Sequence, residues 1–235
     1  MTGTAPAGPG ASVLFVSGLR REAAMIAGPG RVAVCGDAPT LWRKLDELAN
    51  IPFDLVISWG LCGGLDPHLR PGDLILGAEV VSPEGRIIAD EAVTSTLAWR
   101  LTEAWAPVAI ESVAGVSSPV ATARAKADTR AATRAAVVDM ESLIAGRFAL
   151  ERRTPFAILR AVSDPADRDL PPLVFRAMDS EGRIRTAAVA RELLRSPRQF
   201  PGLVAAAQDS RAAFDALGRC RGLPGLFLGL GPAHV

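Results

Sequence analysis

The stretch DLVISWGLCGG, residues 54–64, decides the fold class of this chain. Leu55, Val56 and Ile57 form a continuous apolar run after Asp54, and a glycine-rich turn at 60–64 follows it at once. A short apolar run without polar alternation is typical of a strand covered on both faces, as in the sheets of α/β proteins. The sequence therefore predicts an α/β sheet with helices on both faces.

Similar apolar runs alternate with helical patterns along the rest of the chain. Strands are expected at 13–16, 31–35, 54–58, 73–77, 108–114, 135–138 and 155–162, and helices at 20–27, 41–48, 94–105, 123–134, 142–150, 184–195 and 200–217. This alternation, without a repeat or a linker, indicates a single domain built on a twisted mixed β-sheet. We expect a disordered N-terminal tail over 1–11, the domain over 12–218 and an apolar C-terminal tail over 219–235.

Composition narrows the function classes. The 235 residues include 26 Lys and Arg against 25 Asp and Glu, and this balance argues against a nucleic-acid binder held by phosphate contacts. The mean hydropathy of +0.24 is high for a soluble protein, but the apolar runs are too short and too broken to span a membrane. No signal peptide is recognisable, and three cysteines without metal-ligand spacing fit reduced thiols. We expect a cytoplasmic protein without a metal site.

Polar residues at the ends of the predicted strands are the candidates for chemistry, because ligands of such sheets bind beyond the carboxyl ends of strands. The glycine-rich turn is a weak signal alone. Asp139 is expected to cap the following helix, whereas Glu141 could accept hydrogen bonds from a ribose diol. Asp164 ends a buried strand, where desolvation would raise its pKa and suit it to general-acid work. The alternative for Asp164 is a turn residue paired with Arg160.

Three segments together resemble the purine nucleoside phosphorylase/nucleosidase superfamily over roughly residues 12–170. They are the glycine-rich turn with Leu69–Ile75, the segment Val138–Ser142, and the segment Arg160–Asp164. Within that superfamily, the chain is most similar to the hopanoid-associated phosphorylase group. The points of likeness are Gly18–Ala23, Gly64–Pro67, Ser163–Arg168 and the following Leu170-Pro171-Pro172.

This resemblance implies an enzyme that cleaves the N-glycosidic bond of a purine nucleoside. The implied substrate is adenosylhopane, which would yield adenine and a ribosyl or phosphoribosyl hopane in hopanoid biosynthesis. Asp164 would protonate the leaving purine, Ser163 would orient Asp164, and Glu22 would orient the attacking water. The implied substrate-binding residues are Glu141 and Met140 at the ribose, and Gly63, Cys62 and Val120 at the base.

The resemblance also bears on partners. It implies a homodimer that needs no metal or organic cofactor, with phosphate or water as the co-substrate. Typical phosphorylases of the superfamily hold phosphate with an arginine and a serine, at positions that correspond here to Ser58 and Leu61. Arg20 and Arg21 are alternative phosphate-binding candidates, so phosphorolysis and hydrolysis both stay open.

Two rival functions are weighed against adenosylhopane cleavage. One is a nucleosidase or phosphorylase for a small soluble nucleoside such as methylthioadenosine or adenosine, and the other is a non-catalytic nucleoside-binding protein. The apolar C-terminal tail raises the further expectation of contact with the hopanoid substrate or with the surface of the inner membrane.

Overall fold

The computed structural model describes residues 12–104, 108–171, 173–174, 178–185, 191, 200–223, 225–227 and 230. The expected N-terminal tail, and most of the helix expected at 184–195, lie outside these residues. The elements are β1 (Val13–Ser17), α1 (Arg20–Ile26), β2 (Arg31–Cys35), α2 (Ala38–Glu47), β3 (Leu55–Gly64), β4 (Leu74–Ser82), β5 (Gly85–Ile88), α3 (Glu91–Ala104), β6 (Ala109–Gly115), α4 (Ala123–Thr133), β7 (Val137–Asp139), α5 (Ser142–Glu151), β8 (Phe156–Asp164) and α8 (Phe200–Gly222).

The eight strands form one mixed sheet that closes on itself in part. Its order is β2-β1-β3-β7-β6-β4-β5, and β8 pairs with both β3 and β4. Strands β3, β8, β4, β6 and β7 therefore form a closed ring of pairings, while β1 and β2 extend the sheet from β3. The pairs β1–β3 and β3–β8 are parallel, which brings the carboxyl ends of these three strands to one edge.

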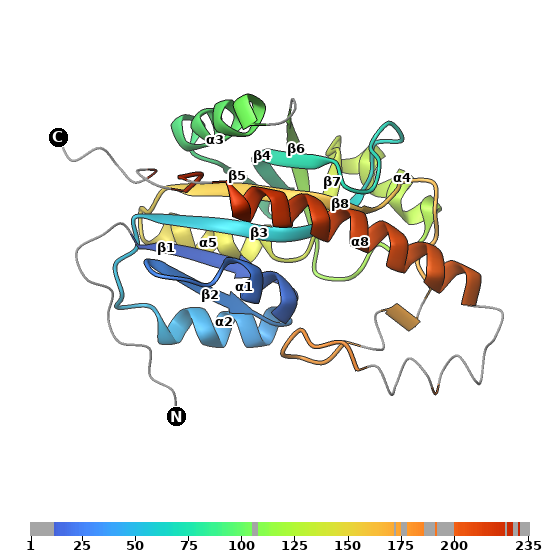
Figure 1. Ribbon diagram of the computed structural model, residues 1–235, viewed down its shortest axis with the longest axis horizontal. Helices are drawn as coiled ribbons and strands as arrows, with labels where there is room; N and C mark the ends of the chain where they lie inside the picture. Colours follow the sequence, from blue (N-terminus) through green and yellow to red (C-terminus); the bar gives the residue numbers. More distant parts are fainter. Residues whose placement is uncertain are drawn as a thin grey trace.

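Helices cover both faces of the sheet, as the sequence predicts. Side chains of β1, β3 and β8 alternate between two hydrophobic clusters, one formed with α1, α3 and α8 and the other with α2 and α5. Figure 1 shows α8 crossing one face of β3 and β8, with α5 on the opposite side. The α/β fold class is thereby confirmed, because successive strand residues point to opposite faces and both faces are apolar.

Strand β3 is longer than the sequence indicates. Residues 60–64, expected as a turn, continue the strand and pair with β8 and β7, with an irregularity in register after Cys62. The prediction was wrong because it rested on the low strand propensity of glycine. In this strand, glycine is present because a larger residue would not fit against its neighbours. A Cβ atom on Gly60 would lie 2.6 Å from the carboxyl carbon of Glu22, and the φ of Gly60 is +147°.

The C-terminal segment also differs from expectation. Helix α8 continues to Gly222, four residues past the expected domain boundary at 218. Beyond it, Leu226, Phe227 and Leu230 are buried in the core, and the ring of Phe227 lies 5.2 Å from that of Phe15 and 6.0 Å from that of Trp59. These described residues thus belong to the domain core and present no apolar surface to a membrane or a ligand.

Within the described residues, no helix is both long enough and apolar enough to cross a bilayer.

Candidate active site

A fully buried arginine, Arg160 of β8, lies among the polar residues at the strand ends. Its Nε atom lies 2.7 Å from Oδ2 of Asp139, and its Nη1 atom lies 3.2 Å from Oε2 of Glu141. The guanidinium also donates hydrogen bonds to the Ser58 hydroxyl and to the carbonyl oxygen of Leu61. Because a buried charge must be paired and hydrogen-bonded, this arginine organises the acids around it.

Asp139 and Glu141 reach Arg160 from the junction of β7 and α5. The Asp139 carboxylate accepts hydrogen bonds from the amide and hydroxyl of Ser142, the first residue of α5, although the N-cap residue of this helix is Glu141. Burial raises the pKa of Glu141 to about 8, against the opposing effect of Arg160. A Cβ atom on Gly18 would lie 2.5 Å from Oε1 of Glu141, so only glycine leaves room for this carboxyl group.

Glu22, a buried residue of α1, faces the same region. Its Oε2 atom accepts hydrogen bonds from the amides of Gly18 at 3.0 Å and Leu19 at 2.8 Å, and its Oε1 atom accepts one from Leu61 at 2.8 Å. Burial raises the pKa of Glu22, while Arg160 and these three amides oppose the shift. One carboxylate is thus held rigidly between the end of β1 and the middle of β3.

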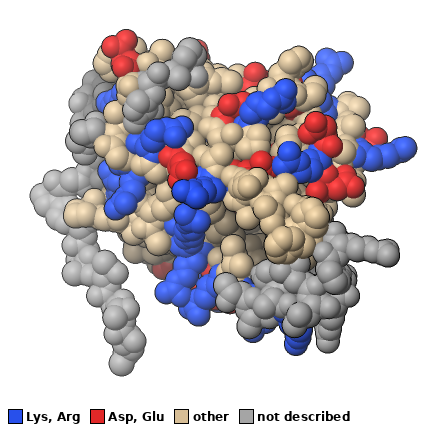
Figure 2. All heavy atoms as spheres, turned by 45° about the vertical axis from the view of Figure 1, so that its right-hand side comes forward, with Lys and Arg blue, Asp and Glu red and all other residues tan. Residues whose placement is uncertain are grey.

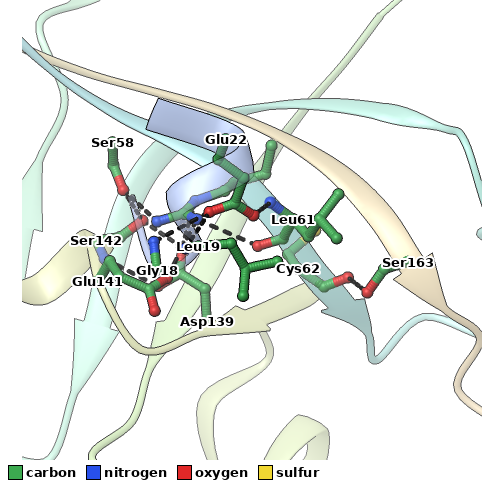
Figure 3. A network of polar contacts seen from close by, with 11 residues as sticks. Gly18, Leu19, Glu22, Ser58, Leu61, Cys62, Asp139, Glu141, Ser142 and Ser163 are labelled. Carbon is green, nitrogen blue, oxygen red and sulfur yellow. Dashed lines mark hydrogen bonds and ion pairs between the residues drawn. The ribbon is translucent and has the colours of Figure 1, made fainter. Parts of the chain in front are cut away.

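Ser163 and Asp164 end strand β8. Figure 3 shows Ser163 beside Cys62. The Ser163 hydroxyl lies 2.7 Å from Oδ1 of Asp164 and 3.2 Å from the carbonyl oxygen of Cys62, so its proton can serve either acceptor. Oδ2 of Asp164 lies 2.7 Å from Nζ of Lys126, a fully buried residue of α4. The partner of Asp164 is therefore Lys126, and the ion pair expected with Arg160 is replaced by the pairs of Arg160 with Asp139 and Glu141.

The candidate residues for the base lie around Gly63. A Cβ atom on Gly63 would lie 3.1 Å from Oδ2 of Asp164 and 3.2 Å from the side chain of Val138. Val120 packs against the small cluster that contains Val138, and Met140 is half-buried beside Glu141. Cys62 is buried, and burial raises the pKa of its thiol, so this thiol is not an activated nucleophile.

Arg20 and Arg21 lie apart from the carboxylates. Arg20 is exposed, and the Arg21 guanidinium lies 3.9 Å from the centre of the Phe214 ring of α8. Both line a groove of about 380 Å³, together with Leu19, Ala24, Gly182, Arg183, Ile184 and Phe214. In Figure 2, which turns the right-hand side of Figure 1 forward, basic side chains form a band down the face that is drawn. The groove begins at Leu19, whose amide binds Glu22.

Sequence reasoning missed the importance of Arg160, Ser58 and Lys126. Arg160 interrupts the apolar run of β8, and this interruption is a signal of a buried charge that could have found it. Ser58 is a weaker signal of the same kind in β3. Lys126 stands among alanines and arginines on α4, and nothing in that pattern distinguishes it from a solvated side chain.

Within the described residues, no three His, Cys, Asp or Glu side chains are grouped to hold a metal ion. The expectation of a metal-free enzyme stays a prediction.

The fold and the grouped acids define a single-domain α/β enzyme of the nucleoside phosphorylase and nucleosidase type. The chain belongs to the phosphorylase superfamily, whose family model matches residues 46–195. A search of curated protein sequences found no match.

Several solved structures share the fold. An S-adenosylhomocysteine nucleosidase from Streptococcus pyogenes has a TM-score of 0.62 at 12% identity, and the match covers 93% of this chain and 100% of that one. A 5′-methylthioadenosine/S-adenosylhomocysteine nucleosidase from Helicobacter pylori has a TM-score of 0.60 at 14% identity, covering 90% and 100%. A futalosine hydrolase mutant from Helicobacter pylori has a TM-score of 0.60 at 14% identity, covering 87% and 99%. At these identities the likeness is one of fold.

Proposed function

We propose that this enzyme hydrolyses the N-glycosidic bond of a purine nucleoside, with water as the nucleophile. The observation that carries this proposal is the environment of Arg160. Its guanidinium is already paired with Asp139 and Glu141, and it also lowers the pKa of the nearby Glu22. Because this cation already faces two acids, it has little charge left to attract a phosphate dianion, whereas a neutral water molecule needs none.

In the proposed reaction, the glycosidic bond breaks as positive charge develops on the sugar. Glu141 would accept hydrogen bonds from the ribose diol, and its ionised form, which becomes populated as the pH rises through about 8, would stabilise the oxocarbenium-like transition state. Glu22 would orient a water molecule and take its proton, a role supported by a raised pKa in a rigidly held carboxylate. Asp164 would donate a proton to the departing purine, with Ser163 holding its Oδ1 atom at 2.7 Å. Water thus adds to the sugar, and the purine leaves as a neutral base.

We further propose adenosylhopane as the substrate. The motif likeness at Gly18–Ala23, Gly64–Pro67 and Ser163–Arg168 to the hopanoid-associated phosphorylase group supports this choice. The groove that includes Leu19, whose amide binds Glu22, also supports it, because Leu19, Ala24 and Ile184 offer apolar surface outside the cluster of acids. A bulky apolar 5′ substituent would need such an open exit from the site.

The experiment is an incubation of the purified protein with adenosylhopane, methylthioadenosine or adenosine, each with and without phosphate. Adenine and the sugar product are followed by mass spectrometry. We expect adenine and free ribosylhopane whether or not phosphate is present, and less product from the small nucleosides. Formation of a sugar phosphate that requires phosphate would overturn hydrolysis. Faster cleavage of methylthioadenosine or adenosine would overturn the choice of adenosylhopane.

A further inference from the structure

Lys126 is a buried charged residue for which the reaction described above has no use. Its side chain is fully buried, and its ammonium group has three partners: Oδ2 of Asp164 at 2.7 Å, the carbonyl oxygen of Pro165 at 2.6 Å and that of Arg168 at 3.0 Å. The two carbonyl oxygens accept hydrogen bonds from the ammonium group, and its charge faces the carboxylate of Asp164, so these contacts are all with groups of the protein. Any influence of Lys126 on the reaction must therefore pass through the groups that it holds.

We propose that Lys126 is a positioning residue for Asp164, the general acid of the proposed function, on which this inference rests. The ammonium holds one carboxylate oxygen of Asp164, and the Ser163 hydroxyl holds the other. The carboxyl group is therefore fixed from two sides, and Gly63 leaves space for it because a Cβ atom there would lie 3.1 Å from Oδ2. When Asp164 gives up its proton, the carboxylate that forms already faces a cation, which stabilises the charge that develops.

The same lysine ties Asp164 to the turn that follows β8 and to the C-terminal helix. Lys126 binds the carbonyl oxygens at both ends of the segment 165–168, and the side chain of Arg168 is paired with Asp209 of α8. The start of α4 is joined to the same turn, because the amide of Ala123 donates to Asp169 at 2.7 Å. Helix α4, helix α8 and the end of β8 therefore meet at the position of Asp164.

A role confined to stability is the alternative for Lys126. A buried ion pair by itself is weak evidence of stabilisation, since a well-packed apolar pair often serves as well. The two roles make different predictions for turnover. A stabilising lysine changes the folded fraction, whereas a positioning lysine changes kcat of the folded enzyme and does so only while Asp164 is present.

The test compares Lys126→Met, Lys126→Gln and Lys126→Arg with wild type, each in the Asp164 and the Asp164→Asn background. We expect Lys126→Met to lower kcat by about 10- to 100-fold with little change in KM. This loss is smaller than the full contribution of a general acid, because Asp164 itself is retained. Lys126→Gln retains a hydrogen-bond donor for the two carbonyl groups but loses the charge, so its kcat should be as low as that of Lys126→Met. Lys126→Arg keeps the charge and should restore part of kcat. In the Asp164→Asn background, Lys126→Met should change kcat by less than about twofold, because residues that act as one unit are not additive.

Arg130→Met is the matched control, since it removes an ion-paired cation one turn further along α4. Arg130 lies 2.6 Å from Asp66, outside the group of residues assigned to the reaction. Its kcat should equal that of wild type, and thermal unfolding of every variant establishes the folded fraction. If Lys126→Met does not fold, Lys126→Gln and Lys126→Arg carry the comparison.

If the wild-type enzyme releases adenine and a folded Lys126 variant has an undiminished kcat, the proposed role of Lys126 is overturned. The proposed function is not affected by that result. An equal further loss of kcat in the Asp164→Asn background would also overturn it, because the lysine would then act independently of Asp164. A wild-type protein that cleaves no purine nucleoside would overturn the proposed function, and this role with it.

Discussion

Replacement of Arg160 by methionine tests the central electrostatic feature of the site. The change removes the cation that pairs with Asp139 at 2.7 Å and Glu141 at 3.2 Å, and leaves both acids buried. Removing one partner of a buried pair costs about 3–5 kcal/mol, because the other charge is left uncompensated. We expect Arg160→Met to lower the free energy of unfolding by about that amount near pH 8.5.

The loss should depend on pH in a defined direction. Burial raises the pKa of Glu141 to about 8 even with Arg160 present, and without the arginine the buried Glu141 holds its proton more strongly. In the unfolded chain, Glu141 ionises near its ordinary pKa of 4.5. The folded variant therefore binds more protons than the unfolded one above that pH, and stability falls as the pH rises, by about 1.4 kcal/mol per pH unit for each such proton. Wild type shares this fall up to about pH 8, where its own Glu141 ionises, so the deficit of the variant should grow only above that pH and be smaller at pH 5.5 than at pH 8.5.

Urea denaturation at the two pH values measures this difference. Arg86→Met is the control, because Arg86 pairs with Glu79 at the surface at 2.9 Å and such pairs contribute about 0–1 kcal/mol. Adding Glu141→Gln to Arg160→Met should recover part of the loss at pH 8.5, since it removes one of the uncompensated acids. A deficit below about 1 kcal/mol, or one that is equal at both pH values, would refute the reasoning.

Three further predictions follow from single contacts. Glu141→Gln should gain stability relative to wild type as the pH rises from about 5 to 8, because the raised pKa of Glu141 makes wild type lose stability across that window. Urea denaturation over a pH series measures the difference in stability, and a constant difference would contradict this prediction. Asp164→Asn should slow adenine release by about 100- to 10,000-fold in a mass-spectrometric assay, and undiminished release would remove Asp164 as the general acid. Phe227→Ala should lower the free energy of unfolding by about 3–5 kcal/mol, because Phe227 packs on Phe15 and Trp59. It should affect cleavage of adenosylhopane and of adenosine equally. A loss of activity with adenosylhopane alone would instead indicate that the segment around Phe227 contacts the substrate.

The sequence was most informative about local patterns. The apolar runs at 55–57 and 157–159 predicted strands covered on both faces, and Ile57 and Leu159 do lie in one cluster while Val56 and Ile158 lie in the other. The same reasoning wrongly predicted a turn at 60–64. The local sequence pattern does not show why glycine is needed within this strand. The reason is the carboxyl groups of Glu22 and Asp164, which occupy the space of the missing side chains.

The candidate site, like the fold, could be predicted from the sequence only in part. The acids at positions 22, 141 and 164 could be listed from the sequence because each follows or ends an expected element. Their partners could not be assigned. Arg160 pairs with Asp139 and Glu141 only because β8 lies beside β3, and Lys126 meets Asp164 only because α4 packs on the turn after β8.

The sequence by itself therefore determined the fold class, the strand ends and the kinds of chemistry they could carry, because apolar periodicity and residue type act over a few neighbouring positions. The tertiary structure alone decided which acid meets which cation, and that the residues around Phe227 belong to the core. Charge pairing depends on distances of 3–4 Å between side chains that are far apart in the chain, and strand order is what brings them within that range.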